Sequence, residues 1–109
     1  MIAAPDPALA GELVLQFRGP RVETEDEIAE IEDALFELLA DGDTWTGHEI
    51  TRDARNIVFE TRDGAATFAR VLPFLQRAGL VDALAAGVRG ASATSYVALW
   101  PPGRAFSRT

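Results

Sequence analysis

Apolar and polar residues alternate with a period of two in several short segments, which predicts β-strands. In residues 13–17 the alternation places Leu13, Leu15 and Phe17 on one side. Segments 44–51 and 56–61 are rich in β-branched and aromatic residues, and the polar residues between them predict a hairpin. Two further strands are expected over 83–89 and 96–100, joined by the small residues of 90–95. These segments predict an antiparallel sheet of four or five strands.

Two other segments have helical periodicity. Thr24 and Glu27 have the spacing of a capping box, and Asp41-Gly42 is a typical helix end. The apolar stripe of this first helix comprises Ile28, Ile31, Leu35, Leu38 and Leu39. The second helix is expected between a cap at Asp63 and an end at Gly79, with apolar residues at Phe68, Leu72 and Leu75. Pro73 lies inside it and predicts a bend or a break, because proline cannot donate to the carbonyl of Ala69.

The resulting order of elements is β-α-β-β-α-β-β, which predicts an α+β fold of the ferredoxin-like, split βαβ kind. In this two-layer sandwich, both helices cover one face of the sheet and the first and third strands lie centrally. We expect a flexible tail over residues 1–11, a single domain over 12–101 and a C-terminal tail over 102–109. The helix-free face is then polar if it meets water, or carries exposed apolar groups such as Trp45, Val58 or Val97 if it meets a partner.

The composition of the 109-residue chain excludes several kinds of chemistry. Cysteine and lysine are absent, so thiolate nucleophiles, cysteine-ligated metals, Schiff bases and a P-loop lysine are excluded. No spacing typical of metal ligands or of a cofactor site is present, and His48 with Asp43, Asp53 or Glu60 would make a poor metal site. We therefore expect no cofactor and no metal. Because no apolar run has the length of a signal peptide or a membrane span, the expected location is cytoplasmic, without membrane contact.

Charge is distributed unevenly along the sequence. Ten of the seventeen acidic residues and none of the ten arginines fall in residues 23–43, within a chain of net charge −7. The first helix directs five acids away from its apolar stripe, namely Glu25, Asp26, Glu30, Asp33 and Glu37. Such a helix repels nucleic acid and attracts a basic partner surface, although a solvated helix face has the same pattern. These five acids, with Trp45 and Trp100, are the candidate partner-binding residues.

The chain also resembles known groups of proteins. Its element order and length resemble ferredoxin-like ACT-type regulatory domains and dimeric α+β barrel proteins. Segments 47–50, 56–61 and 66–68, Leu80 and the late Leu99-Trp100-Pro101 look like a set of small uncharacterised bacterial proteins. That group has no known activity, so the resemblance implies a fold and no catalytic residues.

His48 is the only histidine and is therefore the obvious acid–base candidate. Strict alternation places Trp45, Gly47 and Glu49 on one side of the strand and Thr46, His48 and Ile50 on the other. A catalytic pair would then need a distant carboxylate, for which Glu60 on the neighbouring strand is the candidate. A structural or surface histidine is the alternative.

Three hypotheses on function remain open. The leading one is a non-enzymatic binding or regulatory module that forms a homodimer or docks a protein partner. The second is a cofactor-independent enzyme of the dimeric α+β barrel kind, with His48 as acid or base beside a pocket. The third is an acidic immunity- or antitoxin-like protein that masks a basic toxin.

Overall fold

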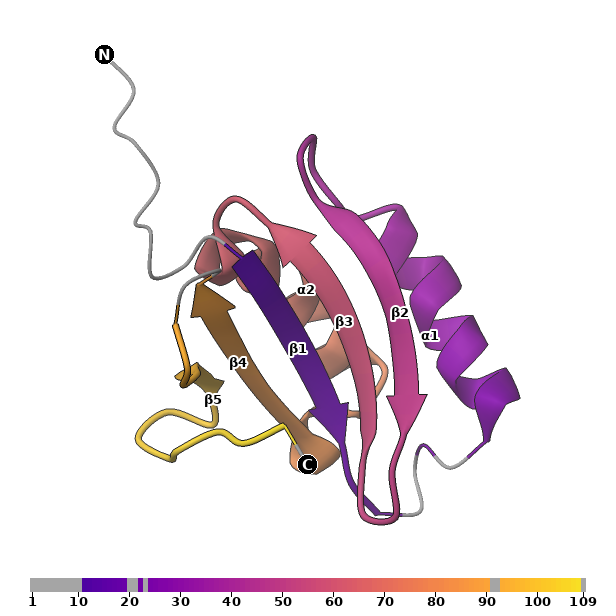
Figure 1. The fold of residues 1–109 in the computed structure, drawn as a ribbon. Helices are drawn as coiled ribbons and strands as arrows, with labels where there is room; N and C mark the ends of the chain where they lie inside the picture. The colour runs from indigo at the N-terminus through magenta and orange to yellow at the C-terminus, as the bar shows by residue number, and fades with distance from the viewer. Residues whose placement is uncertain (1–10, 20–21, 23, 91–92, 109) are drawn as a thin grey trace.

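The structure is a computed structural model that describes residues 11–19, 22, 24–90 and 93–108. Five strands form one antiparallel sheet in the order β2-β3-β1-β4-β5, and two helices lie together on one side of it (Figure 1). The elements are β1 (Gly11–Phe17), α1 (Glu25–Phe36), β2 (Thr44–Ile50), β3 (Arg55–Thr61), α2 (Gly64–Arg77), a short 3-10 turn (Val81–Ala83), β4 (Leu84–Gly90) and β5 (Val97–Trp100). The expected α+β, two-layer architecture is confirmed at this level.

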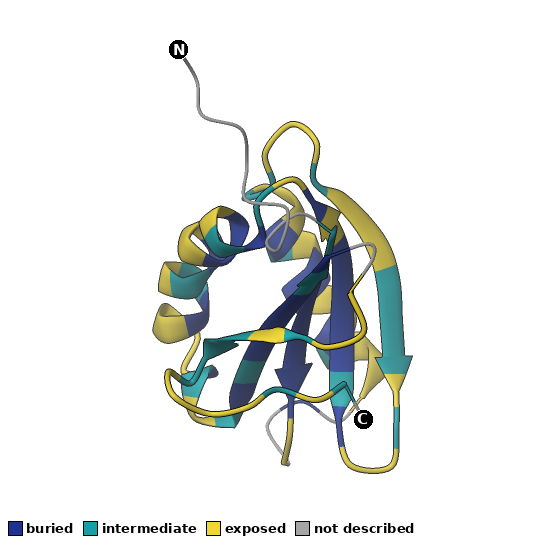
Figure 2. Cartoon of the chain, turned by 60° about the vertical axis from the view of Figure 1, so that its left-hand side comes forward, coloured by how far each residue is buried: buried dark blue, intermediate teal, exposed yellow. Residues whose placement is uncertain are grey.

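The register of the sheet separates its residues into two faces. Leu13 of β1 lies opposite Phe59 of β3 and Val88 of β4. Leu13 and Phe59, with Leu15 and its partners Ile57 and Ala86, belong to a core that includes apolar residues of both helices, such as Ile28 and Leu75. In Figure 2 the side of the helices that faces the sheet is buried, and the side that faces away from it is exposed. We call this side the helix-covered face and the other side the open face.

Both helices begin where their caps predict. Thr24 accepts from the amide of Glu27, whose carboxylate accepts from the amide of Thr24, which completes the capping box. Asp63 accepts from the amide of Ala66 and caps α2. The end of α2 is also as expected, because Gly79 adopts a left-handed φ of 71° directly after the helix.

Two expectations about the helices are corrected by the structure, namely the end of α1 and the effect of Pro73. α1 ends at Phe36 instead of reaching Asp41, because the Leu38 amide already donates to the carbonyl of Leu35, in a tighter turn than the α-helix. α2 runs through Pro73 without a break. Since Ala69 and Pro73 are both exposed, solvent can hydrate the carbonyl that Pro73 leaves without its helical donor.

The structure describes most of the expected C-terminal tail but only Gly11 of the expected N-terminal tail. Residues 1–10 lie outside the described residues, and Gly11 is the first residue of β1. Residues 91–92 of the expected turn also lie outside them. Residues 104–108 do not extend away as a tail, because the chain turns back after Pro101 and crosses the open face above β4 toward β1 (Figure 1). We call residues 104–108 the strap.

Candidate functional site

The outer surface of α1 is acidic and lacks balancing cations. The expected acids are all exposed there, and none of them is paired with a basic side chain among the residues that the structure describes; they are Glu25, Asp26, Glu30, Asp33 and Glu37. Those in the first turn also favour the helix, because its N-terminus carries a partial positive charge. The acids towards the C-terminal end have no such role, so the sequence places negative charge there without a local structural benefit.

An exposed aromatic pair lies at the end of this acidic surface. The rings of Phe36 on α1 and Trp45 on β2 meet edge to face with centroids 5.7 Å apart. They are 44% and 39% exposed, which is unusual for large apolar side chains. An aromatic pair beside uncompensated charge combines the two features that protein interfaces use for affinity and for orientation.

A buried carboxylate holds the aromatic pair in place. Glu32 is 5% exposed, and its two oxygens contact the indole nitrogen of Trp45 and, at 3.0 Å, Nδ1 of His48. Because Glu32 is on α1 and both partners are on β2, these hydrogen bonds tie the helix to the edge strand of the sheet. A buried carboxylate with two hydrogen bonds is stabilised against the cost of leaving water.

A bulge in β2 makes this arrangement possible. Trp45 lies opposite Phe59 and Gly47 lies opposite Val58, so Thr46 is an additional residue in the strand. Strict alternation would place Trp45 and His48 on opposite faces, and the bulge brings both to the helix-covered face. The expected grouping of Trp45 with Glu49 is therefore wrong, since Glu49 lies opposite Asn56 on the open face.

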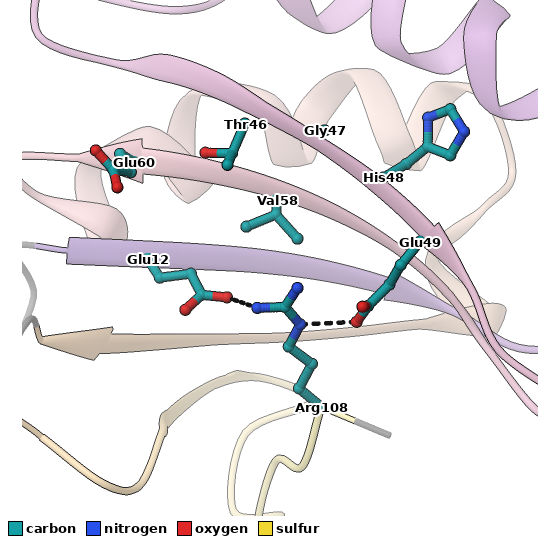
Figure 3. Close-up of a pocket in the computed structure, with 8 residues that line it drawn as sticks. All are labelled: Glu12, Thr46, Gly47, His48, Glu49, Val58, Glu60 and Arg108. Carbon is teal, nitrogen blue, oxygen red and sulfur yellow. Dashed lines mark hydrogen bonds and ion pairs between the residues drawn. The ribbon is translucent and has the colours of Figure 1, made fainter.

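The expected pairing of His48 with Glu60 is likewise not formed. Glu60 lies opposite Glu12 and Thr44 on the open face, whereas the ring of His48 contacts Glu32 on the other side of the sheet. His48 borders a depression on the open face by its position in β2, but its ring points away from that depression (Figure 3). The geometry thus assigns His48 a structural contact.

Glu32 was missed as a site residue, although the sequence does contain a signal for it. It is four residues after Ile28 and three before Leu35, so it lies on the apolar stripe of α1. A charged residue on such a stripe needs a buried partner, and the hydrogen-bonding groups of Trp45 and His48 are those partners.

The two tryptophans have different environments. Trp100 is directed to the helix-covered face, where its ring lies 6.3 Å from that of Phe68 and packs against the core. Of the two expected partner-binding tryptophans, only Trp45 belongs to the surface beside the acidic helix.

Comparisons of the chain with protein-family models, with curated proteins and with solved structures gave no match. The site therefore has to be interpreted from its own geometry.

None of the three apolar residues considered for the open face is exposed on it. Trp45 is on the helix-covered face, Val58 is 5% exposed, and Val97 lies opposite Val88, a position of the helix-covered face. The strap covers part of this face through Phe106 and Arg108. The strap therefore leaves only part of the open face accessible to a flat partner surface.

Charged residues on the open face gather around Arg108 (Figure 3). Arg108 donates to Glu12 and, over 2.7 Å from Nε, to Glu49. The hydrogen bond that Arg108 donates to Glu49 lowers the pKa of Glu49 below its ordinary value, and the same bond raises the pKa of Arg108. Beside this group is a depression of about 330 Å³ that Glu60 also lines.

The structure offers no support for a metal site or a membrane span in its described part. Within residues 11–19, 22, 24–90 and 93–108, no three histidine, aspartate or glutamate side chains are grouped to bind an ion. Asp43, one of the residues considered for a metal, accepts from Arg70 at 2.8 Å and from Thr67. No helix in the same residues has the length and apolarity to cross a bilayer.

Tyr96 provides a test of the packing on the open face. Burial raises the pKa of its phenol above the ordinary value, and the hydroxyl donates to Glu12. Since the folded pKa is above the unfolded one, the associated stability is present below about pH 10 and is lost as the pH rises through the folded pKa. Tyr96 is the only tyrosine, so its absorbance at 295 nm is specific. We expect a titration above pH 10 in the native protein and at the ordinary pH in 8 M urea; coincident curves would contradict this packing.

Proposed function

We propose that the chain is a protein-binding module that docks a basic partner surface on the outer side of α1 and the Phe36–Trp45 pair. The observation that carries the proposal is the coexistence of two exposed aromatic rings with five exposed acids that pair with no basic side chain in the described part of the chain. The acids select the sign of the partner and steer its approach, while the rings supply apolar area that is removed from water on contact.

A basic protein fits this surface better than a second copy does. Two copies that met through α1 would bring acids of the same sign together, which is unfavourable unless cations intervene. A partner with arginines or lysines would neutralise Asp33 and Glu37 and could place a guanidinium over an exposed ring. An antitoxin-like protein that masks a basic toxin is one form of this function.

The ferredoxin-like classification of the fold is also part of the proposal. The order β2-β3-β1-β4 of neighbouring strands supports it.

The acid–base hypothesis for His48 gains no support from the geometry. Its expected partner Glu60 is on the opposite face, and its ring is directed away from the neighbouring depression. The Glu32 carboxylate contacts Nδ1 of His48, but it is buried and also accepts from Trp45. These contacts fit a structural link between α1 and β2.

The proposal is tested with a defined basic probe, a peptide amide of six arginines and one tryptophan, titrated into the ¹⁵N-labelled protein at low and moderate salt. We expect the shift changes to concentrate in α1 and around Trp45, and the affinity to fall with salt. Glu37→Arg should weaken binding at least about tenfold, equivalent to about 1.4 kcal/mol. Phe36→Ala should weaken it through lost apolar contact alone.

The matched control is Asp82→Arg, which makes the same change of net charge at an exposed acid in the 3-10 turn before β4. If binding depended only on net charge, Asp82→Arg and Glu37→Arg would weaken it equally. That result, or shift changes spread evenly over the protein, would refute a docking face on α1.

A further inference from the structure

The strap lies on the open face as a peptide lies on a receptor. It forms no strand with the sheet, and its described backbone contact with the sheet is the carbonyl of Ser107, which accepts from the Gln16 side-chain amide at 3.0 Å. Two side chains of the strap, Phe106 and Arg108, also contact this face. The strap is therefore held at two side-chain positions, two residues apart.

The first position is an aromatic seat on β4. The ring of Phe106 lies directly over Gly87, where an added Cβ would be 2.4 Å from Cδ1 of the ring. Tyr96 closes the side of this seat, with its ring centroid 5.1 Å from that of Phe106. A glycine at 87 thus leaves a ring-sized space on a sheet face that any other residue would fill.

The second position is an arginine seat made by Glu12 and Glu49. Both carboxylates are oriented by groups that do not belong to the strap. Glu12 accepts from Arg89 at 2.8 Å and from the hydroxyl of Tyr96 at 3.2 Å, and Glu49 accepts from Asn56 at 2.9 Å. Because these partners are on strands β3 and β4 and beside β5, the seat keeps its geometry if Arg108 leaves. It is preorganised for a guanidinium, which can donate to two carboxylates at once.

Arg108 itself is held less firmly than the two carboxylates that bind it. The side chain of Arg108 is 30% exposed, so water can compete for its carboxylate partners when the strap is released. The depression of about 330 Å³ next to Arg108 is lined by Glu60, which pairs with no cation in the described part of the chain. The open face can therefore accommodate more of a basic segment than the strap supplies.

We propose that the open face is a binding site for a segment of another protein that carries an aromatic residue two positions before an arginine, and that the strap is its intramolecular competitor. Release of the strap exposes both seats together, so binding of such a segment is coupled to displacement of residues 104–108. This site is on the opposite side of the sheet from Trp45 and does not depend on the docking face of α1.

The experiment uses the full chain with Phe106→Ala and Arg108→Gln, which empties both seats while the strands stay intact. The probe is a fluorescently labelled peptide of sequence Gly-Arg-Ala-Phe-Ser-Arg, identical to residues 103–108. We expect saturable binding to the double variant and at least about tenfold weaker binding to the unmodified chain, because a tethered competitor acts at an effective concentration in the millimolar range. A probe with alanine in place of its last arginine should bind at least about tenfold more weakly.

Two further variants link the result to the seats. Glu12→Gln, added to the double variant, should weaken the probe at least about tenfold, and Gly87→Ala should block its aromatic ring. Glu37→Arg on α1 should have no effect, which separates this site from the proposed function. Circular dichroism confirms folding, and Arg108→Gln alone serves if the double variant does not fold.

The proposal is overturned if the probe fails to bind a folded variant, or if Glu12→Gln and Gly87→Ala leave its affinity unchanged. It is also overturned if light scattering shows the unmodified chain to be a dimer that Arg108→Gln converts to monomers. In that case the seats would hold the strap of a second copy.

Discussion

Replacing Phe59 by alanine is expected to lower the free energy of unfolding by about 4 kcal/mol. Phe59 is 1% exposed and lies in β3 between Leu13 of β1 and Trp45 of β2, so its ring fills the core where the edge strand joins the sheet. Truncation removes apolar burial and leaves a cavity that the surrounding strands cannot close. Urea denaturation followed by circular dichroism measures the change.

The control is the same substitution at an exposed phenylalanine. Phe36→Ala removes a ring that is 44% exposed and touches Trp45, so we expect a loss below about 1 kcal/mol. Equal losses at the two positions would contradict the assignment of Phe59 to the core and of Phe36 to the surface. The same Phe36 variant is suitable for the binding test because it should remain folded.

Replacing Glu32 by alanine is expected to cost about 2 kcal/mol, since hydrogen bonds to a charged group are removed from a buried position. Both Trp45 and His48 lose their partner on α1, and the helix loses its polar tie to β2. The tryptophan emission, to which Trp100 also contributes, should shift to the red because the Trp45 indole becomes more hydrated. The free energy of unfolding and the emission maximum are measured on the same samples.

Glu32→Gln is the matched variant, because it keeps the size and one acceptor oxygen but removes the charge. We expect it to cost about 1 kcal/mol. A double-mutant cycle of Glu32→Ala with His48→Ala should give a coupling energy of about 1 kcal/mol, as for residues in contact. Additive effects would show that the two side chains do not stabilise each other.

The elements of the fold could be predicted because their signals are local. The capping box at Thr24 needs only Glu27 three residues later, and the alternation through Leu13, Leu15 and Phe17 specifies one buried side of a strand. Helix ends depend on fewer constraints, and α1 ended early because a tight turn at Leu38 replaced its last turn. Pro73 was tolerated because its position on α2 faces solvent.

The site could be predicted only where it depends on composition. The acids of α1 were found because their spacing places them away from the apolar stripe. The contacts of Glu32 with β2 could not be predicted. The additional residue Thr46 changes which face the following residues of β2 point to, and the sequence pattern does not reveal such a bulge. The strap was not found because Arg108 meets Glu12 across 96 positions of sequence. Contacts of that kind depend on tertiary geometry and have no local pattern.

The central position of β1 has a consequence for how the protein is made. β1 is synthesised first but pairs with β3 and β4, and its Glu12 meets Arg89, 77 positions later. The sheet therefore cannot close on a ribosome-bound chain until most of the domain has emerged. Such distant pairing slows folding relative to a helical bundle of similar length. We expect nascent chains that stop before β4 to remain sensitive to protease, and the strap to dock as the last step.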